Sequence, residues 1–291
     1  MTHWSDMSLH DKYDQPENFN LTGQVAIVTG GGRGIGRAFA QALAKVGVKI
    51  VVTARTKHEL EQTVELIQSS GGQAIAIPGD VSEPSTVEQI AKITEKKFGT
   101  ADILINNAGI TGPVTNEWDA DPSDWWRTME INMRGTYLMT REILPSMISR
   151  NRGRIINLTS AVVLKTYPYF TSYTVSKAAI IYYTQNLAGQ VKDQGISVFA
   201  YHPGGPETEM SRHLAESSEV HDSVREIFKK MYENDANTPM EIPVQDVLMM
   251  ASGQSDPLTG RFLMHTDDQK EMLTRIDEIE RDNLYVLTRR T

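Results

Sequence analysis

The sequence contains no cysteine among its 291 residues. Disulfide bonds and thiolate metal sites are therefore excluded, and the seven histidines are scattered without the spacing of metal ligands, so we expect no metal site. No apolar run is long enough to cross a bilayer, and residues 1–6 lack the basic start and the apolar core of a secretory signal. These absences favour a cytoplasmic protein with no membrane partner.

Positive charge is also in short supply. The chain has 29 Lys and Arg residues against 37 Asp and Glu residues, a net charge of −8 with a pI near 5.4. This balance argues against a general nucleic-acid partner or an anionic membrane surface, although it leaves the charge of a small substrate open. The apolar share of 40% is enough for a substantial core.

Apolar runs and helical patterns alternate from Val25 to about Met264, with no Pro/Gly/Ser linker between them. This alternation predicts an α/β fold: one domain with a doubly wound parallel sheet and helices on both faces. The expected strands are 25–29, 49–54, 73–78, 102–106, 154–159 and 196–201, and the expected helices are 35–46, 57–69, 84–98, 123–150 and 173–193.

The chain divides into three parts. Residues 1–20 are polar and predict a flexible N-terminal extension, and residues 21–267 form the predicted catalytic domain, in which 208–238 are long enough to close over a ligand as a lid. Residues 268–291 predict an acidic helical tail. We interpret its charges as a solvated helix face. The alternative is that its apolar stripe contacts a neighbouring subunit.

A glycine-rich turn follows the first apolar run. The segment 25–29 enters Gly30-Gly31-Gly32-Arg33-Gly34-Ile35-Gly36 and then a helical pattern. Such a turn lets backbone N–H groups and a positive helix end approach a pyrophosphate without side chains in the way. The glycines read G-x-x-x-G-x-G rather than the general G-x-G-x-x-G fingerprint, and the strand-turn-helix context still favours a dinucleotide site.

Three side chains near the middle of the chain predict general acid chemistry. Tyr173 and Lys177 are four residues apart, which places both on one face of a helix, and Ser160 ends the apolar run before them. A neighbouring cation stabilises a phenolate, so we expect Lys177 to lower the pKa of Tyr173 from about 10 towards the working range. One carbonyl group can then meet a hydroxyl, a phenol and an ammonium.

Together these motifs resemble the short-chain dehydrogenase/reductase family, in its compact single-domain branch. Each motif is weak singly, but their order and spacing are specific over almost all of 21–267. The matching elements are Thr29-Gly30-x-x-x-Gly34-x-Gly36, Gly79-Asp80-Val81, Asn106-Asn107-Ala108-Gly109, Asn132, Ser160, Tyr173-x-x-x-Lys177 and Pro203-Gly204 followed by Thr208. The resemblance implies a Rossmann-type sheet, a nicotinamide cofactor and a catalytic tetrad of Asn132, Ser160, Tyr173 and Lys177.

The resemblance also implies a role for each residue. Tyr173 donates a proton to the oxygen of a ketone or aldehyde as NADPH delivers hydride, and Ser160 hydrogen-bonds that oxygen. Lys177 serves the Tyr173 pKa and the nicotinamide ribose, while Asn132 holds a water that connects Lys177 to solvent. The implied cofactor-binding residues are Gly30, Gly32, Arg33, Gly34, Ile35, Gly36, Arg55, Asp80, Val81, Asn107, Ala108, Gly109, Tyr173, Lys177, Pro203, Gly204 and Thr208.

The end of the second expected strand favours NADP(H) over NAD(H). An acidic residue there would bind the ribose 2′-hydroxyl and repel a 2′-phosphate, but this chain has Ala54 followed by Arg55. Arg33 can approach the same phosphate, and two guanidinium groups suit a dianion. By resemblance, Asp80 lies near the adenine.

Several residues depart from the family pattern. Pro206 stands where relatives usually offer a backbone N–H to the nicotinamide carboxamide, and proline has none. His202 replaces a residue that is more often Asn, and we expect a solvent-facing or turn-bonded histidine rather than a proton relay. The segment 258–265 lacks the Gly-rich ending that is common in relatives.

The expected substrate is a medium-sized, mostly apolar carbonyl or alcohol compound. The lid offers Met210, Leu214, Phe228, Met231 and Tyr232, and the opposite wall offers Val162, Leu164, Tyr167, Tyr169 and Phe170. Two alternatives stay open: a catalytically idle dinucleotide sensor or partner protein, and an acyl-carrier-protein ketoreductase that meets its acidic carrier through basic residues. Analogy alone implies a homotetramer or homodimer.

Overall fold

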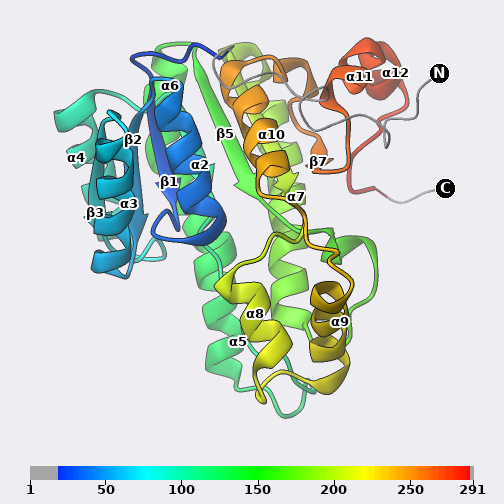
Figure 1. The fold of residues 1–291 in the computed structure, drawn as a ribbon. Helices are drawn as coiled ribbons and strands as arrows, with labels where there is room; N and C mark the ends of the chain where they lie inside the picture. Colours follow the sequence, from blue (N-terminus) through cyan, green and yellow to red (C-terminus); the bar gives the residue numbers. More distant parts are fainter. Residues whose placement is uncertain (1–18, 289–291) are drawn as a thin grey trace.

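The computed structural model describes residues 19–288 and contains one seven-stranded sheet (Figure 1). All strand pairs are parallel, in the order β3-β2-β1-β4-β5-β6-β7. The strands are β1 (Val25–Thr29), β2 (Lys49–Ala54), β3 (Ala74–Pro78), β4 (Ile103–Asn106), β5 (Gly153–Leu158), β6 (Ile196–His202) and β7 (Phe262–Met264). The predicted fold class is confirmed, and the six expected strands agree with the observed ones to within about one residue.

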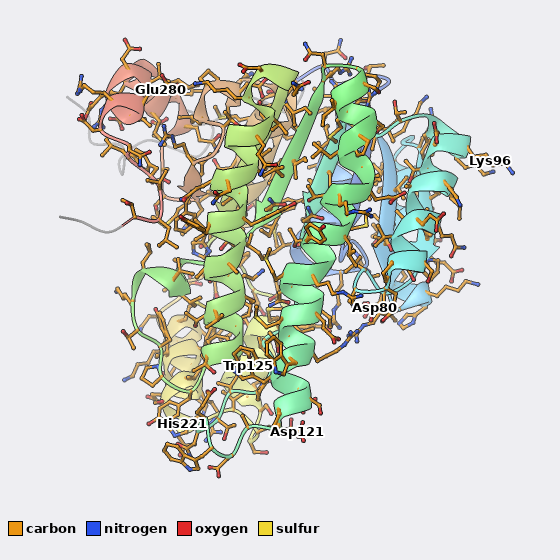
Figure 2. The ribbon with its side chains drawn as sticks, turned by 180° about the vertical axis from the view of Figure 1, so that it is seen from behind. Asp80, Lys96, Asp121, Trp125, His221 and Glu280 are labelled. Atoms are coloured by element: carbon orange, nitrogen blue, oxygen red, sulfur yellow. The ribbon has the colours of Figure 1, made fainter. Side chains whose placement is uncertain are left out.

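Helices cover both faces of the sheet (Figures 1 and 2). Side chains of β1 alternate between two apolar cores: Ala26 and Val28 belong to one and Ile27 to the other. Because helices bury both faces of the sheet, the strand sequences are continuous apolar runs and do not alternate between apolar and polar residues. The first face carries α2 (Gly34–Lys45), α3 (Lys57–Ser69) and α10 (Glu241–Ser252), and the second carries α4 (Pro84–Phe98), α6 (Gly135–Ser149) and α7 (Thr171–Val191).

The strand order reverses between β1 and β4, and this position fixes where a ligand can bind. The chain runs outward from β1 through β2 to β3, then returns to β4 on the other side of β1. In open parallel sheets, the crevice at the carboxyl ends of the strands opens at such a switch point. Beyond this edge lie α5 (Pro122–Met129), α8 (Glu209–Glu216) and α9 (Asp222–Glu233) (Figure 1).

The helix expected at 123–150 is interrupted. It consists of α5, a π-helical turn at Glu130–Arg134 and α6. A π turn inserts one residue into the helical repeat, and such turns are frequent at functional sites. The predicted helical span is confirmed to within about one residue, but the apolar periodicity of the sequence cannot resolve one inserted residue, so the π turn was not predicted.

The C-terminal segment packs on its own domain. The two short helices α11 (Gln269–Thr274) and α12 (Ile276–Arg281) bury Met272 and Ile279 in the core of the first face. Met272 and Ile279 of the predicted stripe are therefore covered by the chain itself, and a contact of this segment with a neighbouring subunit stays a prediction. Of the predicted N-terminal extension, 1–18 lie outside the described residues, and Phe19 is buried. Within 19–288, no helix combines the length and the apolar character that a membrane crossing requires.

Candidate active site

The turn after β1 can be built only from glycine at two positions. Gly30 has a φ of 63°, and a Cβ added there would lie 2.7 Å from the side-chain nitrogen Nδ2 of Asn107. At Gly36 an added Cβ would lie 2.3 Å from the carbonyl oxygen of Gly30. The backbone of the turn is thus packed against α2 and against the strand end that carries Asn107, with no space for side chains.

The first turn of α2 leaves its amide groups available. Arg33 is the N-cap residue, and its side chain makes no capping hydrogen bond. The first N–H groups of a helix have no partner within the helix, and together with the helix dipole they favour an anion.

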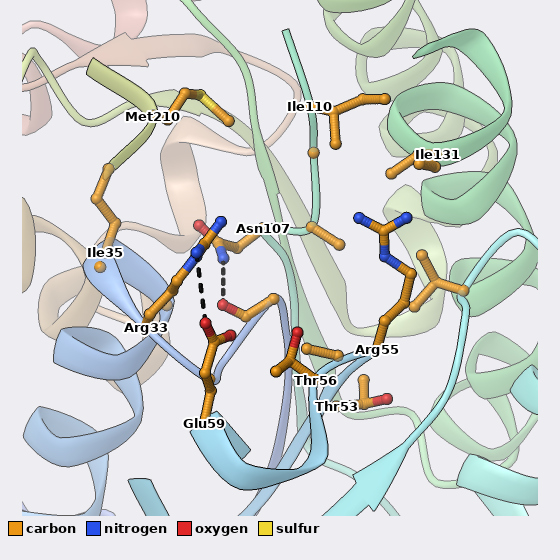
Figure 3. Close-up of a pocket in the computed structure, with 18 of the residues that line it drawn as sticks. Arg33, Ile35, Thr53, Arg55, Thr56, Glu59, Asn107, Ile110, Ile131 and Met210 are labelled. Atoms are coloured by element: carbon orange, nitrogen blue, oxygen red, sulfur yellow. Dashed lines mark hydrogen bonds and ion pairs between the residues drawn. The ribbon is translucent and has the colours of Figure 1, made fainter. Parts of the chain in front are cut away.

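A cavity of about 260 Å³ opens in front of this turn (Figure 3). It is lined by Gly30, Gly32, Arg33, Gly34, Ile35, Gly36, Arg55, Asp80, Val81, Asn107, Ala108, Gly109 and Thr208 from the predicted cofactor residues. Sequence reasoning missed Thr53, Thr56, Glu59, Ile110, Ile131 and Glu209, which also line it, and predicted Met210 only as a residue of the lid. Most of these residues lie next to motif residues in the sequence, at the same strand ends and helix starts. Proximity in sequence to a motif could therefore have indicated that they line the cavity.

The two arginines of the cavity have different surroundings. The Arg33 guanidinium is 3.3 Å from a Glu59 carboxylate oxygen and also pairs with Glu209. The exposed Arg55 guanidinium has no hydrogen-bond or ion-pair partner in the part of the chain that the structure describes. Figure 3 shows the two groups on opposite sides of the cavity, Arg33 beside Glu59 and Arg55 towards Ile131.

Asp80 lines the same cavity and is held in place by its neighbours. Its carboxylate accepts hydrogen bonds from the Ser82 amide (2.9 Å) and hydroxyl (2.7 Å), and it pairs with Arg127 of α5. Burial acts to raise the pKa of Asp80, but the Ser82 hydrogen bonds and the Arg127 charge outweigh it and lower the pKa. Asp80 is therefore an ionised acceptor at neutral pH.

A second cavity of about 320 Å³ lies under the lid. Ile35, Thr208 and Met210 line both cavities, so the start of the lid separates them. The second cavity is also lined by Ser160, Tyr173, Pro203 and Gly204 from the predicted site. A molecule that extends along the switch point from Arg55 would reach these residues beyond Thr208.

Tyr173 and Lys177 lie one turn apart in α7, as predicted. The Lys177 Nζ is 5.5 Å from the centre of the Tyr173 ring and donates a 2.9 Å hydrogen bond to the carbonyl of Leu158 at the end of β5. Ser160 follows that strand, and its hydroxyl accepts a hydrogen bond from the Val162 amide at 3.4 Å. The Thr159 hydroxyl donates to the carbonyl of Lys177 at 2.9 Å, which ties β5 to α7.

Burial dominates the electrostatics of this group. It raises the pKa of Tyr173 to about 12, opposed by a hydrogen bond with Ser160, and it lowers the pKa of Lys177 to about 8. The expected lowering of the Tyr173 pKa is not found, because the Lys177 ammonium faces the ring and the Leu158 carbonyl while the cavity wall desolvates the phenol. The phenol is protonated at neutral pH and is placed to act as an acid.

Asn132 occupies the π-helical turn and is fully buried. Its amide nitrogen donates to the Ile110 carbonyl (3.0 Å) and the Ser176 hydroxyl (2.9 Å), and its side-chain oxygen accepts from the Ile110 amide (2.9 Å). Asn132 therefore ties the loop after β4 to α7. Neither Asn132 nor Lys177 lines either cavity. Both side chains lie behind lining residues such as Gly109.

The lid and its opposite wall agree with the sequence at most positions. Met210, Leu214, Phe228 and Met231 line the second cavity, as do Val162, Tyr167 and Phe170. Three expected residues do not, namely Tyr232, Leu164 and Tyr169. The Tyr232 hydroxyl lies 2.8 Å from the Ser211 hydroxyl, Leu164 is exposed, and Tyr169 stacks on His221 with the ring centres 3.5 Å apart. His221 lies at the end of the molecule remote from the sheet (Figure 2).

The segment after β6 is held by its own chain. The Gly205 amide donates to the Thr238 hydroxyl at 3.1 Å, and Thr208 caps α8 by accepting a hydrogen bond from the Ser211 amide. His202, the last residue of β6, is half-buried, and its ring stands edge-on to His265. The ring makes no hydrogen bond to a turn in the described residues, and it is partly covered by His265 while it lines the second cavity. Among the described residues, no group of three or more His, Asp or Glu residues is placed to hold a metal.

The comparisons with known proteins agree with this geometry. Residues 24–219 match the family model described as short chain dehydrogenase. A short chain dehydrogenase of Pseudocercospora fijiensis is 33% identical over 96% of this chain and 94% of its own length. A 3-oxoacyl-[acyl-carrier-protein] reductase of Synechocystis is 38% identical over 67% of this chain and 78% of its own.

Solved structures have the same architecture. A gluconate 5-dehydrogenase from Burkholderia cenocepacia, in complex with NADP and tartrate, superposes with a TM-score of 0.76 at 27% identity, covering 86% of this chain and 96% of that one. The KRED1-Pglu enzyme superposes with a TM-score of 0.75 at 29% identity, covering 82% and 99%. The chain therefore belongs to the short-chain dehydrogenase/reductase family of oxidoreductases, which bind a nicotinamide cofactor and act on alcohol or carbonyl groups.

Proposed function

We propose that this protein is an NADP(H)-dependent reductase of apolar ketones or aldehydes, with Tyr173 as the general acid. The observation that carries the proposal is the position of Tyr173 and Ser160 on the wall of the second cavity, directly beyond the glycine turn of the first. A carbonyl group in that cavity can meet the phenol and the serine hydroxyl together.

The residues fit a dinucleotide along the switch point. The first cavity supplies a glycine turn that any Cβ would fill at Gly30 and Gly36, the free N-terminus of α2, and the cationic Arg55. Gly30, Gly32, Gly34, Ile35 and Gly36 would hold the pyrophosphate. Asp80, Val81, Asn107, Ala108 and Gly109 would hold the adenosine, and Pro203, Gly204 and Thr208 would hold the nicotinamide end.

Each member of the tetrad has a defined task. When bound, the nicotinamide supplies the hydride. Tyr173 donates its phenolic proton to the carbonyl oxygen as negative charge develops there, and Ser160 donates a hydrogen bond to the same oxygen. The Lys177 ammonium stabilises the phenolate that remains, and Asn132 fixes the loop after β4 and α7 relative to each other. Alcohol oxidation is the reverse path.

Arg55 and Arg33 support NADP(H) rather than NAD(H). Ala54 stands at the end of β2, where a carboxylate would repel a 2′-phosphate, and the unpaired Arg55 guanidinium faces the cavity. Arg33 would add a second cation once it leaves Glu59 and Glu209. We therefore assign the main phosphate contact to Arg55.

The alternatives have less support. A dinucleotide sensor would need neither Ser160 and Tyr173 on the wall of a cavity of substrate size nor Lys177 beside Tyr173. A ketoreductase for acyl-carrier protein would need several basic residues free to meet an acidic carrier, and the candidates are Arg212, Lys229 and Lys230. Arg212 pairs with Glu207 and Lys230 lies 3.5 Å from a Glu226 carboxylate oxygen, which leaves Lys229 without an ion pair to the described residues. The division into extension, domain and tail, the oligomeric state and the cytoplasmic location stay predictions from the sequence and the family.

The test is binding of NADPH and NADH, followed by oxidation of each with a panel of aryl and alkyl ketones and aldehydes. We expect NADPH to bind more tightly and to be oxidised with at least one ketone. Tight NADPH binding without turnover on any carbonyl compound would favour the sensor, and a preference for NADH would overturn the role given to Arg55.

A further inference from the structure

The second cavity has two apolar walls. Val162 and Phe170 lie on one side, and Leu214, Phe228 and Met231 of the lid lie on the other. An apolar body fills such a cavity, so the few polar groups in it decide which compounds are preferred.

Several polar groups of the cavity are already committed. The Thr159 hydroxyl donates to the Lys177 carbonyl at 2.9 Å. The Ser211 hydroxyl lies 3.0 Å from the Thr208 carbonyl and 2.8 Å from the Tyr232 hydroxyl, and Thr208 caps α8. Ser160 and Tyr173 are assigned to the reacting carbonyl oxygen, so none of these groups is left for another part of the substrate.

His202 differs from all of them. It lines the cavity from the end of β6, and its Nδ1 is buried with no hydrogen-bond partner. Within 19–288 the ring accepts and donates no hydrogen bond that ties it to the protein. Because Nδ1 is buried away from the cavity, Nε2 is the ring nitrogen that a molecule in the cavity can reach.

The surroundings keep the His202 ring uncharged. The His265 ring stands edge-on, with the ring centres 5.4 Å apart and the planes at 82°, and the Lys177 ammonium lies on α7 behind the cavity. Burial lowers the pKa of His202 to about 3, and the charges of His265 and Lys177 act in the same direction. A neutral imidazole suits an uncharged oxygen and gives a carboxylate no charge to pair with.

We propose that His202 binds a second, uncharged oxygen of the substrate through its Nε2. The inference rests on the proposed reductase function and narrows its substrate class to apolar ketones or aldehydes that carry one further hydroxyl or carbonyl oxygen. Ser160 and Tyr173 hold the oxygen that is reduced, and His202 selects the orientation in which the other oxygen faces β6.

The test compares kcat/KM for propiophenone with kcat/KM for its α-hydroxy and α-diketone analogues, using NADPH. We expect the wild-type protein to prefer the oxygenated ketones, and His202→Phe, which keeps a ring without nitrogen, to reduce that preference about tenfold. His202→Gln should retain part of it. Tyr167→Phe removes a phenol hydroxyl of the same cavity that is not assigned to the reacting oxygen. An unchanged preference in this variant supports His202 as the group that binds the second oxygen, and a loss as large as that in His202→Phe contradicts the inference.

Should His202→Phe fail to fold, His202→Ala with added imidazole replaces it, and imidazole should restore the preference for the oxygenated ketones. An unchanged preference in the His202 variants, or an equal loss on all three ketones, overturns the inference while the reductase function stands. A weaker NADPH Kd in these variants would place the ring against the nicotinamide and also overturns it. No turnover of any ketone by the wild-type protein contradicts the proposed function itself.

Discussion

The Lys177 ammonium lies over the face of the Tyr173 ring, 5.5 Å from its centre, and donates a hydrogen bond to the carbonyl of Leu158. Burial brings the pKa of Lys177 down to about 8 while it raises that of Tyr173 to about 12. Lys177 therefore loses its positive charge at mildly alkaline pH, whereas Tyr173 keeps its phenolic proton to a much higher pH.

This order predicts the alkaline limb of the pH profile. Because the charged form of Lys177 is present below its lowered pKa and lost above it, we expect kcat/KM for ketone reduction to fall as pH rises through about 8. Lys177→Arg, which keeps its charge at that pH, should shift this limb upward even if it lowers the rate. A limb at pH 8 that survives the substitution would assign the titration to another group.

Cofactor preference should respond differently to the two arginines and their partners. Arg55→Ala should weaken NADPH binding about ten- to hundredfold and leave NADH unchanged, since a hydrogen bond to a charged phosphate is lost. Glu209→Gln should strengthen NADPH binding by about two- to fivefold, because the exposed Arg33–Glu209 pair competes with the phosphate. Lys57→Ala, near Arg55 but paired with Glu61, is the control for titration calorimetry. Equal losses with NADH would show that Arg55 does not read the 2′-phosphate.

The glycine turn can be tested by adding one methyl group. Gly36→Ala places a Cβ 2.3 Å from the Gly30 carbonyl oxygen, so the turn must shift, and we expect a loss of about 1–3 kcal/mol in the free energy of unfolding together with weaker NADPH binding. Gly189→Ala on α7 has open space around its added Cβ and should gain up to about 1 kcal/mol from helix propensity. Urea denaturation of both variants makes the comparison, and a neutral Gly36→Ala would refute the close approach.

The desolvation of the His202 ring predicts a contribution to acid instability. Its folded-state pKa of about 3 lies below the ordinary value of 6.5, so the unfolded chain binds more protons between these values. Stability from this group is complete above about pH 6.5 and falls by about 1.4 kcal/mol for each unit of acidification below it. The raised pKa of Asp246, about 7, has the opposite effect in that range, so the total slope is a sum.

His202→Asn isolates the contribution of one histidine. The difference in unfolding free energy between pH 6.5 and pH 5 should shrink by about 2 kcal/mol relative to the wild-type protein. His265 stays in the variant, and its own lowered pKa leaves a residual slope. An identical slope in the two proteins would mean that the His202 ring takes up its proton without unfolding.

Much of the fold and of the site follows from local sequence. Strands that are buried on both faces appear in the sequence as apolar runs such as Val25–Thr29. The glycine turn depends on one strand-turn-helix unit, and the Tyr173/Lys177 spacing depends on one helix. For this reason the thirteen predicted residues of the first cavity line it together.

Two of the features that sequence reasoning missed depend on contacts between distant segments. Glu209 meets Arg33 across 176 positions, and His265 covers His202 because Met264 is in register with His202 in the β6–β7 pair. The π-helical turn at Asn132 arises from one inserted residue, which apolar periodicity does not resolve. The two long-range contacts require the folded chain, whereas the π turn is a local feature that a helical pattern of apolar residues does not distinguish from an α-helix.

The central claim is that Tyr173 gives the proton, and the most direct measurement is single-turnover oxidation of bound NADPH by a ketone in the wild-type protein and in Tyr173→Phe. We predict a rate lower by about 10²–10⁴-fold in the variant, because the acid is removed, and an NADPH Kd that changes far less than the rate. A variant that oxidises NADPH at the wild-type rate would contradict the account.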